Sequence, residues 1–351
     1  MGETPTPPQG RPRGDPLLAI AVPLAPIVLE RRYRLLVDAL WRLGRSRPAQ
    51  WALAAGSGAV VVLLALLAAR HFASTSWPLA SGDPGLLVAA GLLLLVAQAL
   101  KAYGWGRLFV PDERPKVLAL AAGNGGAALV GLVLPGRFDD AMRIAVVRRY
   151  PGCPAGVRVL CLSLVMLGLI DSVALAPLAL AAAVLPGVSP GMRVGLAVVA
   201  AGGLMAAALI LALPRLAGAN RLLRFQLGRW LSPRTTSRRI ALQAWALVSA
   251  CWLVRALAVF VLLGTLGVGF SFTLALLFLC AGAAAAALPV GLAGAATQVG
   301  VGGAALIASG VGASQALSVA VSVAALGVLS GGAILLFAVV WRTGLLLTER
   351  A

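Results

Sequence analysis

The chain has 351 residues, of which 60% are apolar and only 11% are charged. Soluble domains contain about 25% charged residues, so this composition excludes an ordinary soluble protein. Lys and Arg number 29 against 11 Asp and Glu, a net charge of +18. Such an excess can indicate nucleic-acid binding. Here the cations lie in short clusters between long apolar runs, which indicates membrane topology instead, and no nucleic-acid partner is expected.

The chain begins with a segment that we expect to lie outside the membrane. Residues 1–28 are rich in Pro and Gly and predict a disordered tail. Residues 29–48 predict an amphipathic interfacial helix, because Leu residues recur at helical spacing with Arg residues between them. A similar pattern of Leu, Trp and Arg recurs at 216–231, within a basic cytoplasmic loop at 215–239. Residues 346–351 predict a short tail.

Six apolar runs are long enough to cross a membrane, which takes about 20 residues. They cover residues 51–70, 85–108, 157–185, 192–214, 240–266 and 312–341. A transmembrane domain is therefore predicted over 49–345, with a first half at 51–214 and a second half at 240–341.

Two further apolar stretches are interrupted, at 117–135 by Gly123-Asn124-Gly125-Gly126 and at 271–310 by Pro289 and several Gly residues. Basic clusters at 31–47, 137–158 and 215–239 contain six, five and seven Arg. All three fall on the cytoplasmic side only if 117–135 dips into the membrane and returns. A second re-entrant segment at 271–310, entering from the outer side, also makes both termini cytoplasmic.

The predicted fold is therefore an all-α integral membrane protein with about six spanning helices and two re-entrant hairpins. Interrupted segments that enter from opposite faces also predict an inverted repeat with a binding site where its halves meet. The alternative is eight plain spanning helices, in which the glycines of the interrupted segments serve helix packing.

The most distinctive polar segment follows the first interrupted stretch. Pro135-Gly136 ends the predicted hairpin there, and Arg137 lies just past its turn. Asp139, Asp140 and Arg143 come next, and the spacing of Asp139 and Arg143 predicts an ion pair on one helix face. A guanidinium at the mouth of a membrane cavity suits a phosphate. The alternative is that these Arg residues only set topology and the Asp residues only neutralise them.

Two charges lie deep within predicted spans, Asp171 in 157–185 and Arg255 in 240–266. Each is costly in lipid, so each is expected to face the bundle interior. Their opposite signs predict an Asp171–Arg255 contact, either as a structural salt bridge or as a site for a headgroup or a proton. Lys101, near the end of its span, is expected to snorkel to the interface.

Metal and catalytic motifs are sparse. The chain has one His and four Cys, and neither residue type has metal-ligand spacing. No nucleotide-binding motif is recognisable. We therefore expect no cofactor, no metal and no enzymatic activity.

Three parts of the chain resemble a known protein family. The stretch LPGRFDDAMRIAVVRRYPG, the intramembrane Asp171 that follows it, and LPVGLAGAATQVGVGGAALIASGVG at 288–312 are similar to the lysylphosphatidylglycerol synthase transmembrane-region (flippase-like) family. The resemblance covers roughly residues 50–341. It implies a membrane domain that moves or holds a lipid headgroup. The aminoacyltransferase domain of bifunctional members is not expected here, and Gln298 stands where many members have an acidic residue.

The residues predicted to bind substrate are Asn124, Pro135, Gly136, Arg137, Asp139, Asp140, Arg143, Asp171, Arg255, Pro289 and Gln298. The predicted function is a lipid flippase that moves an anionic or aminoacylated headgroup between leaflets without ATP. One alternative is a non-transporting membrane partner of a lipid or glycan biosynthetic enzyme. Another is an integral membrane enzyme acting on a headgroup, with Asp139 and Asp140 as Mg²⁺ ligands.

The expected partners are membrane lipids, with a biosynthetic enzyme and a homo-oligomer left open. Of the 29 cations nearly all are Arg, which suggests a GC-rich bacterial coding bias. The predicted location is therefore the bacterial inner membrane.

Overall fold

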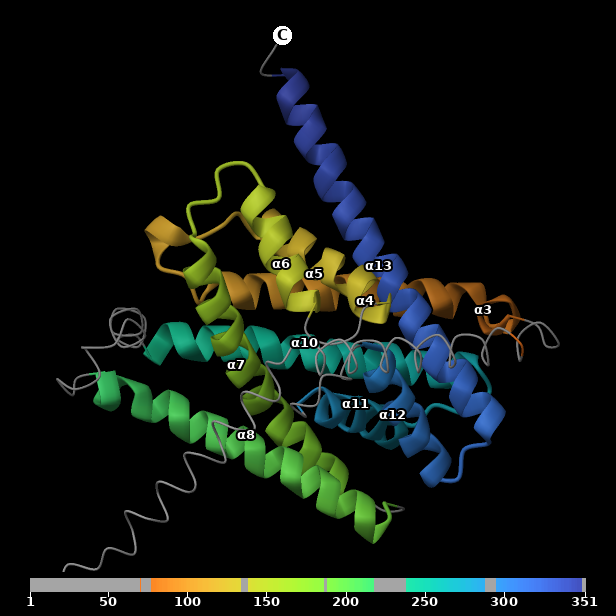
Figure 1. The fold of residues 1–351 in the computed structure, drawn as a ribbon. Helices are drawn as coiled ribbons and strands as arrows, with labels where there is room; N and C mark the ends of the chain where they lie inside the picture. The colour runs from red at the N-terminus through yellow and green to blue at the C-terminus, as the bar shows by residue number, and fades with distance from the viewer. Residues whose placement is uncertain are drawn as a thin grey trace, which may run out of the picture. The chain divides into compact units, whose positions relative to one another are not determined.

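A computed structural model of the chain describes residue 70 and residues 77–133, 138–185, 188–217, 238–287 and 295–348. The chain divides into two compact units, Met1–Ala52 and Leu53–Ala351, and all described residues belong to the second. These residues form ten α-helices and one 3₁₀ turn, with no β-strand among them, so the all-α prediction is confirmed (Figure 1). The predicted tail at 1–28, the interfacial helix at 29–48, most of the loop at 215–239 and the end of the 346–351 tail lie outside the described residues.

Among the described residues, five helices are long and apolar enough to cross a membrane. The shortest of them has 23 residues, which at 1.5 Å per residue gives about 34 Å, more than the hydrocarbon core of a bilayer. They agree with five of the six predicted spans, and the sixth, 51–70, lies outside the described part except for Arg70. Their bounds are α4 Pro84–Gly106, α7 Val157–Val184, α8 Pro190–Ala217, α10 Arg238–Thr265 and α13 Ala313–Thr348.

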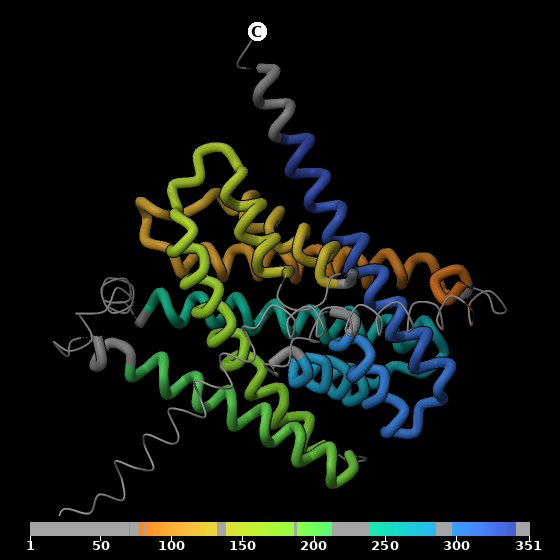
Figure 2. Tube along the Cα trace, in the orientation of Figure 1, coloured from red at the N-terminus to blue at the C-terminus, as the bar shows by residue number. Residues whose placement is uncertain are grey.

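Four shorter helices form two helical hairpins, each made of two arms that pack against each other. The first hairpin consists of α5 Val117–Val133 and α6 Phe138–Arg149, and the second of α11 Phe272–Ala287 and α12 Ala295–Ala308. The longest arm has 17 residues, about 25 Å, which is too short to cross a bilayer alone. The two hairpins contact each other through α5 and α12. Figure 2 traces the first hairpin in yellow and the second in light blue.

The predicted outline of the first hairpin was wrong. We expected 117–135 to dip and return by itself, broken at its central glycines, but α5 is one continuous helix through this stretch. The returning arm is α6, which begins after residues 134–137 and contains Asp139, Asp140 and Arg143. The segment Pro135-Gly136-Arg137 therefore lies between the two arms in the sequence, and not after the hairpin. Re-entrance of either hairpin into a membrane stays a prediction.

The order long helix, hairpin, long helix occurs twice, as α4, α5–α6, α7 and as α10, α11–α12, α13. The first helices of the two series, α4 and α10, lie side by side along their length (Figure 1). The remaining long helix, α8, packs mainly on α7. This arrangement accords with two related halves, and the inverted repeat itself stays a prediction.

Glycines bring the helix backbones into direct contact. A Cβ on Gly125 of α5 would lie 2.4 Å from the carbonyl oxygen of Gly331 of α13, and one on Gly203 of α8 would lie 2.4 Å from that of Ser172 of α7. A Cβ on Gly123 would lie 2.9 Å from a methyl group of Val147 and 3.3 Å from the carbonyl oxygen of Arg143, both on α6. Small residues allow such close approach between helices in membranes, where packing rather than the hydrophobic effect drives association. The glycines around Asn124 therefore serve helix packing, the role that the eight-span alternative gave them.

Candidate functional site

The interhelical charge cluster consists of Lys101 of α4, Asp171 of α7, and Trp252 and Arg255 of α10. The Lys101 ammonium donates to Asp171 Oδ2 at 2.8 Å, and the Trp252 indole N–H donates to Asp171 Oδ1 at 3.0 Å. The Lys101 and Asp171 side chains are only 11% and 19% exposed. One carboxylate thus joins three long helices, and both of its oxygens are occupied.

The predicted Asp171–Arg255 contact is wrong, because Lys101 occupies the place assigned to Arg255. Lys101 does not extend to the interface as expected, since its ammonium reaches the buried carboxylate instead. Pairing compensates part of the cost of burying each charge. Arg255 instead lies over the Trp252 ring, with its guanidinium carbon 5.2 Å from the ring centroid. This is a cation–π geometry.

The sequence analysis missed the roles of two of these residues. It did not name Trp252 as a site residue, and it did not identify Lys101 as the partner of Asp171. A usable signal was present in each case. Trp252 and Arg255 are three residues apart, and Lys101 and Trp105 are four apart, so each pair shares a helix face.

A second polar contact supports the cluster. The Trp105 indole N–H donates to Ser163 Oγ at 2.9 Å, and Ser163 Oγ in turn donates to the carbonyl of Leu160 at 2.8 Å. Trp105 and Ser163 are both fully buried. This contact lies one turn beyond Lys101 along α4, so α4 is tied to α7 at two levels. The ties fix the height at which Lys101 meets Asp171.

The charges of the cluster do not balance. Two cations, Lys101 and Arg255, stand against one carboxylate, Asp171. Within the described part of the chain, Arg255 forms no ion pair. The cluster therefore carries a net charge of about +1 in the interior of a helix bundle, a condition that favours an anionic ligand.

The hairpin polar cluster comprises Asp139, Asp140 and Arg143, all on the first half of α6. Arg143 Nη2 lies 3.4 Å from Asp139 Oδ2, so the predicted i,i+4 pair is confirmed. Arg143 Nη1 also donates to Asp140 Oδ1, while its buried Nε has no partner. Both carboxylates lie in the first helical turn, where the helix dipole favours negative charge. Two acids against one Arg leave this cluster net negative, so the charge of Arg143 is already offset.

Asn124 of α5 is 3% exposed, and neither its amide oxygen nor its amide nitrogen has a hydrogen-bond partner. It lies one turn from Leu120, which contacts the Gly106 position of α4. Gly123 and Gly126 form a different face of α5, the one that meets α6. Asn124 therefore lies on a different face of α5 from the face that meets α6, the helix that contains the hairpin polar cluster. The sequence analysis had placed Asn124 and this cluster in one candidate site.

Replacing Asn124 by Leu, which has a similar branched shape, is expected to raise the free energy of unfolding by about 1–3 kcal/mol. The reason is that the substitution removes a buried polar group that has no partner. Thermal unfolding of the purified protein in detergent measures this change. A loss of stability on Asn124→Leu would contradict it and would show that the amide has a partner, such as a bound water.

The remaining predicted residues are placed only in part. Pro135, Gly136, Arg137 and Pro289 lie outside the described residues. Gln298 lies on α12 with a half-buried side chain, and its backbone carbonyl oxygen would be 2.8 Å from a Cβ on Gly282 of α11. Over the described ranges, no three His, Cys, Asp or Glu side chains gather in a way that could hold a metal ion.

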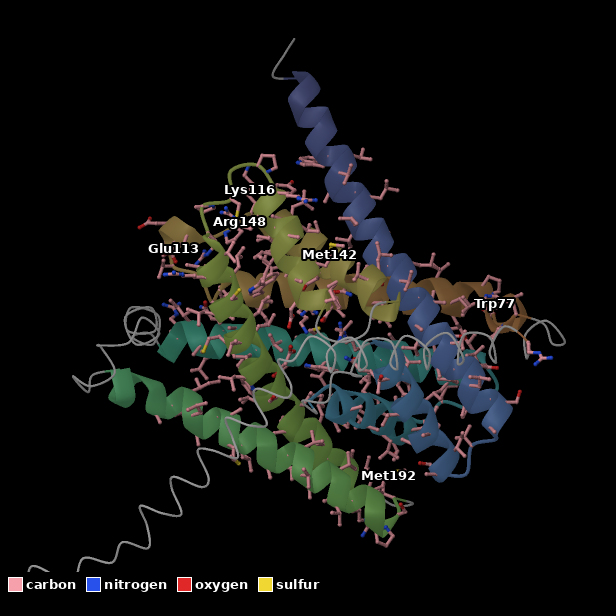
Figure 3. All side chains as sticks on the ribbon, in the orientation of Figure 1. Trp77, Glu113, Lys116, Met142, Arg148 and Met192 are labelled. Atoms are coloured by element: carbon pink, nitrogen blue, oxygen red, sulfur yellow. The ribbon has the colours of Figure 1, made fainter. Side chains whose placement is uncertain are left out.

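Figure 3 labels side chains that lie toward different ends of the helices. Glu113, Lys116 and Arg148 lie together at one end, near the connections between α4 and α5 and between α6 and α7. Trp77 and Met192 lie away from that end, near the starts of α4 and α8. Charged side chains occur at both ends, because Asp83 caps the start of α4 and Arg193 follows Met192 on α8.

Comparison with known proteins gives one finding. The family model described as "Lysylphosphatidylglycerol synthase TM region" matches residues 49–334, which include all four residues of the interhelical charge cluster and all three of the hairpin polar cluster. Searches of curated proteins and of solved structures found no match. With most of its length matched, and with five helices long enough to span a bilayer, the chain belongs to the lysylphosphatidylglycerol synthase transmembrane-region family of membrane proteins.

Proposed function

We propose that the protein moves an anionic lipid headgroup between membrane leaflets without ATP, and that the interhelical charge cluster binds the headgroup. The observation that carries this proposal is the charge imbalance of Lys101, Asp171 and Arg255 among α4, α7 and α10. Arg255 is half-buried, and a cation within a spanning helix that lacks a carboxylate partner is costly in a membrane protein. A lipid phosphate would supply the missing negative charge.

Arg255 is the residue that we assign to the phosphate. Its guanidinium presents several donors in a planar fork, which matches phosphate oxygens better than an ammonium does. The cation–π contact with Trp252 holds the guanidinium beside the other members of the cluster. Lys101 has a different role, because Asp171 already occupies it and so limits how tightly the site holds an anion. A transport site needs such moderate affinity, since the headgroup must also leave.

The hairpins provide the route in this proposal. Arms too short to cross a bilayer would enter from opposite faces and meet near its middle, where α5 contacts α12. Helix ends at membrane depth are tolerated only where they are buried in protein or line a wet cavity. The positive-inside rule assigns the end with Lys116 and Arg148 to the cytoplasm. We also assign both chain termini to the cytoplasm, as the basic clusters of the sequence predict. The membrane would be the bacterial inner membrane, as the sequence predicts.

The test is a leaflet-resolved lipid assay in proteoliposomes without nucleotide. A fluorescent phosphatidylglycerol is placed in both leaflets, and a membrane-impermeant quencher reports how fast inner-leaflet lipid becomes accessible. We expect faster and complete quenching with the protein present, because the charge cluster provides a polar site inside the bilayer. A rate equal to that of protein-free liposomes would contradict the proposal.

A further inference from the structure

A groove of about 150 Å³ lies on the outside of the first hairpin, at the end of the bundle that contains Arg148. Its floor is formed by α5, and its two walls by α6 and α13. Both walls pack on α5, but α6 and α13 do not pack closely against each other. The lining residues are Ala122, Val146, Arg149, Tyr150, Leu335, Ala338 and Val339.

The groove is apolar along its walls and polar at one end. Its polar residues, Arg149 and Tyr150, are adjacent in the sequence at the C-terminal end of α6. The Arg149 side chain is exposed and forms no ion pair with any residue in the described ranges. Its neighbour Arg148 differs, because it donates to the carbonyl of Ala155 at 3.1 Å. Arg149 is therefore a cation with free donors beside an apolar channel.

The aromatic residues indicate the depth of the groove in the membrane. Trp341 lies just beyond the groove on α13, 54% exposed, with its ring 6.0 Å from that of Phe337. Trp and Tyr gather at the membrane–water boundary, where their apolar rings and polar atoms are both accommodated. Trp341 and Tyr150 thus place the Arg149 end of the groove at headgroup level. The apolar walls then extend from that level into the acyl region.

We propose that this groove binds one anionic phospholipid, with its phosphate at Arg149 and an acyl chain against the walls of α6 and α13. A free phosphate ion would leave the apolar walls unexplained, so a lipid is the occupant that accounts for both parts of the groove. None of its lining residues belongs to the interhelical charge cluster. The lipid is therefore a bound companion that fills the space between the hairpin and α13, and not the transported molecule.

The experiment uses the full chain in phosphatidylcholine vesicles that contain a minor fraction of a photoactivatable phosphatidylglycerol, with a diazirine midway along one acyl chain. Illumination, proteolysis and mass spectrometry identify the labelled residues. A phosphatidylcholine probe with the same diazirine chain serves as the lipid control. We expect the phosphatidylglycerol probe to label the groove lining in preference to the phosphatidylcholine probe.

Two pairs of variants test the two parts of the groove. Arg149→Gln should lower phosphatidylglycerol labelling about fivefold, the effect of one cation at an anionic membrane surface, while Arg107→Gln at the same end of the bundle should not. Ala338→Trp should abolish labelling by filling the groove, while Leu336→Trp on the exposed face of α13 should not. If Ala338→Trp does not fold, Val339→Trp at the half-exposed edge makes the same test.

The results that would overturn the proposal are specific. Equal labelling of the groove by both probes, or labelling that is unchanged in Arg149→Gln, would mean that the groove contacts bulk membrane lipid and does not bind phosphatidylglycerol specifically. Absence of label from the groove would mean that no lipid occupies it. Neither result depends on transport activity, so this proposal can fail while the proposed function stands, and the reverse also holds.

Discussion

Replacing Asp171 by Ala is expected to lower the free energy of unfolding by about 3–5 kcal/mol, the cost of breaking a buried ion pair by removing one partner. The substitution leaves the Lys101 ammonium without its carboxylate and the Trp252 N–H without its acceptor. It also leaves the interhelical charge cluster with two cations and no carboxylate. Unfolding of the purified protein in mild detergent with increasing denaturing detergent measures the loss.

The double variant Lys101→Met, Asp171→Asn separates charge from packing. It removes both partners of the ion pair, and the Asn carbonyl can still accept from Trp252. Replacing a buried pair by uncharged groups of similar volume is often neutral, so most of the lost stability should return. A double variant as unstable as Asp171→Ala would contradict this explanation. A stable double variant that no longer transports lipid would show that the charges serve binding beyond structure.

Replacing Gly125 by Ala is expected to cost about 1–3 kcal/mol, because overpacking a tight contact forces backbone shifts. The added Cβ would meet the carbonyl oxygen of Gly331 at 2.4 Å, and its three nearest atoms, in Gly331 and Leu335, are all backbone atoms that cannot rotate away. Since this crossing joins the first hairpin to α13, the hairpin should loosen as well. Thermal unfolding measures the stability, and protease susceptibility of the α5–α6 connection measures the loosening.

Gly202→Ala is the matched control, since a Cβ at that position of α8 meets nothing within 4 Å. Ala is the better helix former by up to about 1 kcal/mol, so this variant should be neutral or slightly stabilised. Gly331→Ala affects the same α5–α13 crossing as Gly125→Ala. Its effect should therefore not add fully to that of Gly125→Ala in the double variant. Equal behaviour of Gly125→Ala and Gly202→Ala would contradict the packing role.

The fold was predictable from the sequence wherever apolar length decided the outcome. Five predicted spans agree with α4, α7, α8, α10 and α13 to within a few residues, because a run of that length can only be a helix in a membrane. The second interrupted stretch was also outlined well, since Pro289 and the glycines near it fall between α11 and α12. The first was misjudged, because Gly123, Gly125 and Gly126 look like a break in the sequence but pack inside a continuous helix.

The candidate site was less predictable, because its contacts depend on how helices are rotated about their axes. Arg255 was predicted as the partner of Asp171 because the two residues lie at a similar depth in the membrane. Depth alone does not determine which face of its helix a residue occupies. Lys101 is on the face of α4 that is tied to α7, and its long side chain reaches the carboxylate from there. The Asp139–Arg143 pair was predictable, because both residues lie on one helix at a spacing that fixes their contact.

The central claim is that the unbalanced cation of the interhelical charge cluster binds the lipid headgroup. The most direct measurement is the leaflet-resolved transport rate of Arg255→Gln beside that of the wild type, in proteoliposomes with equal amounts of folded protein. Arg107→Gln, an exposed Arg outside the cluster, controls for the change in net charge. We expect at least a tenfold lower rate for Arg255→Gln, since loss of a charge-assisted hydrogen bond is worth about 1.5–3 kcal/mol, and an unchanged rate for Arg107→Gln. A wild-type rate for Arg255→Gln would contradict it.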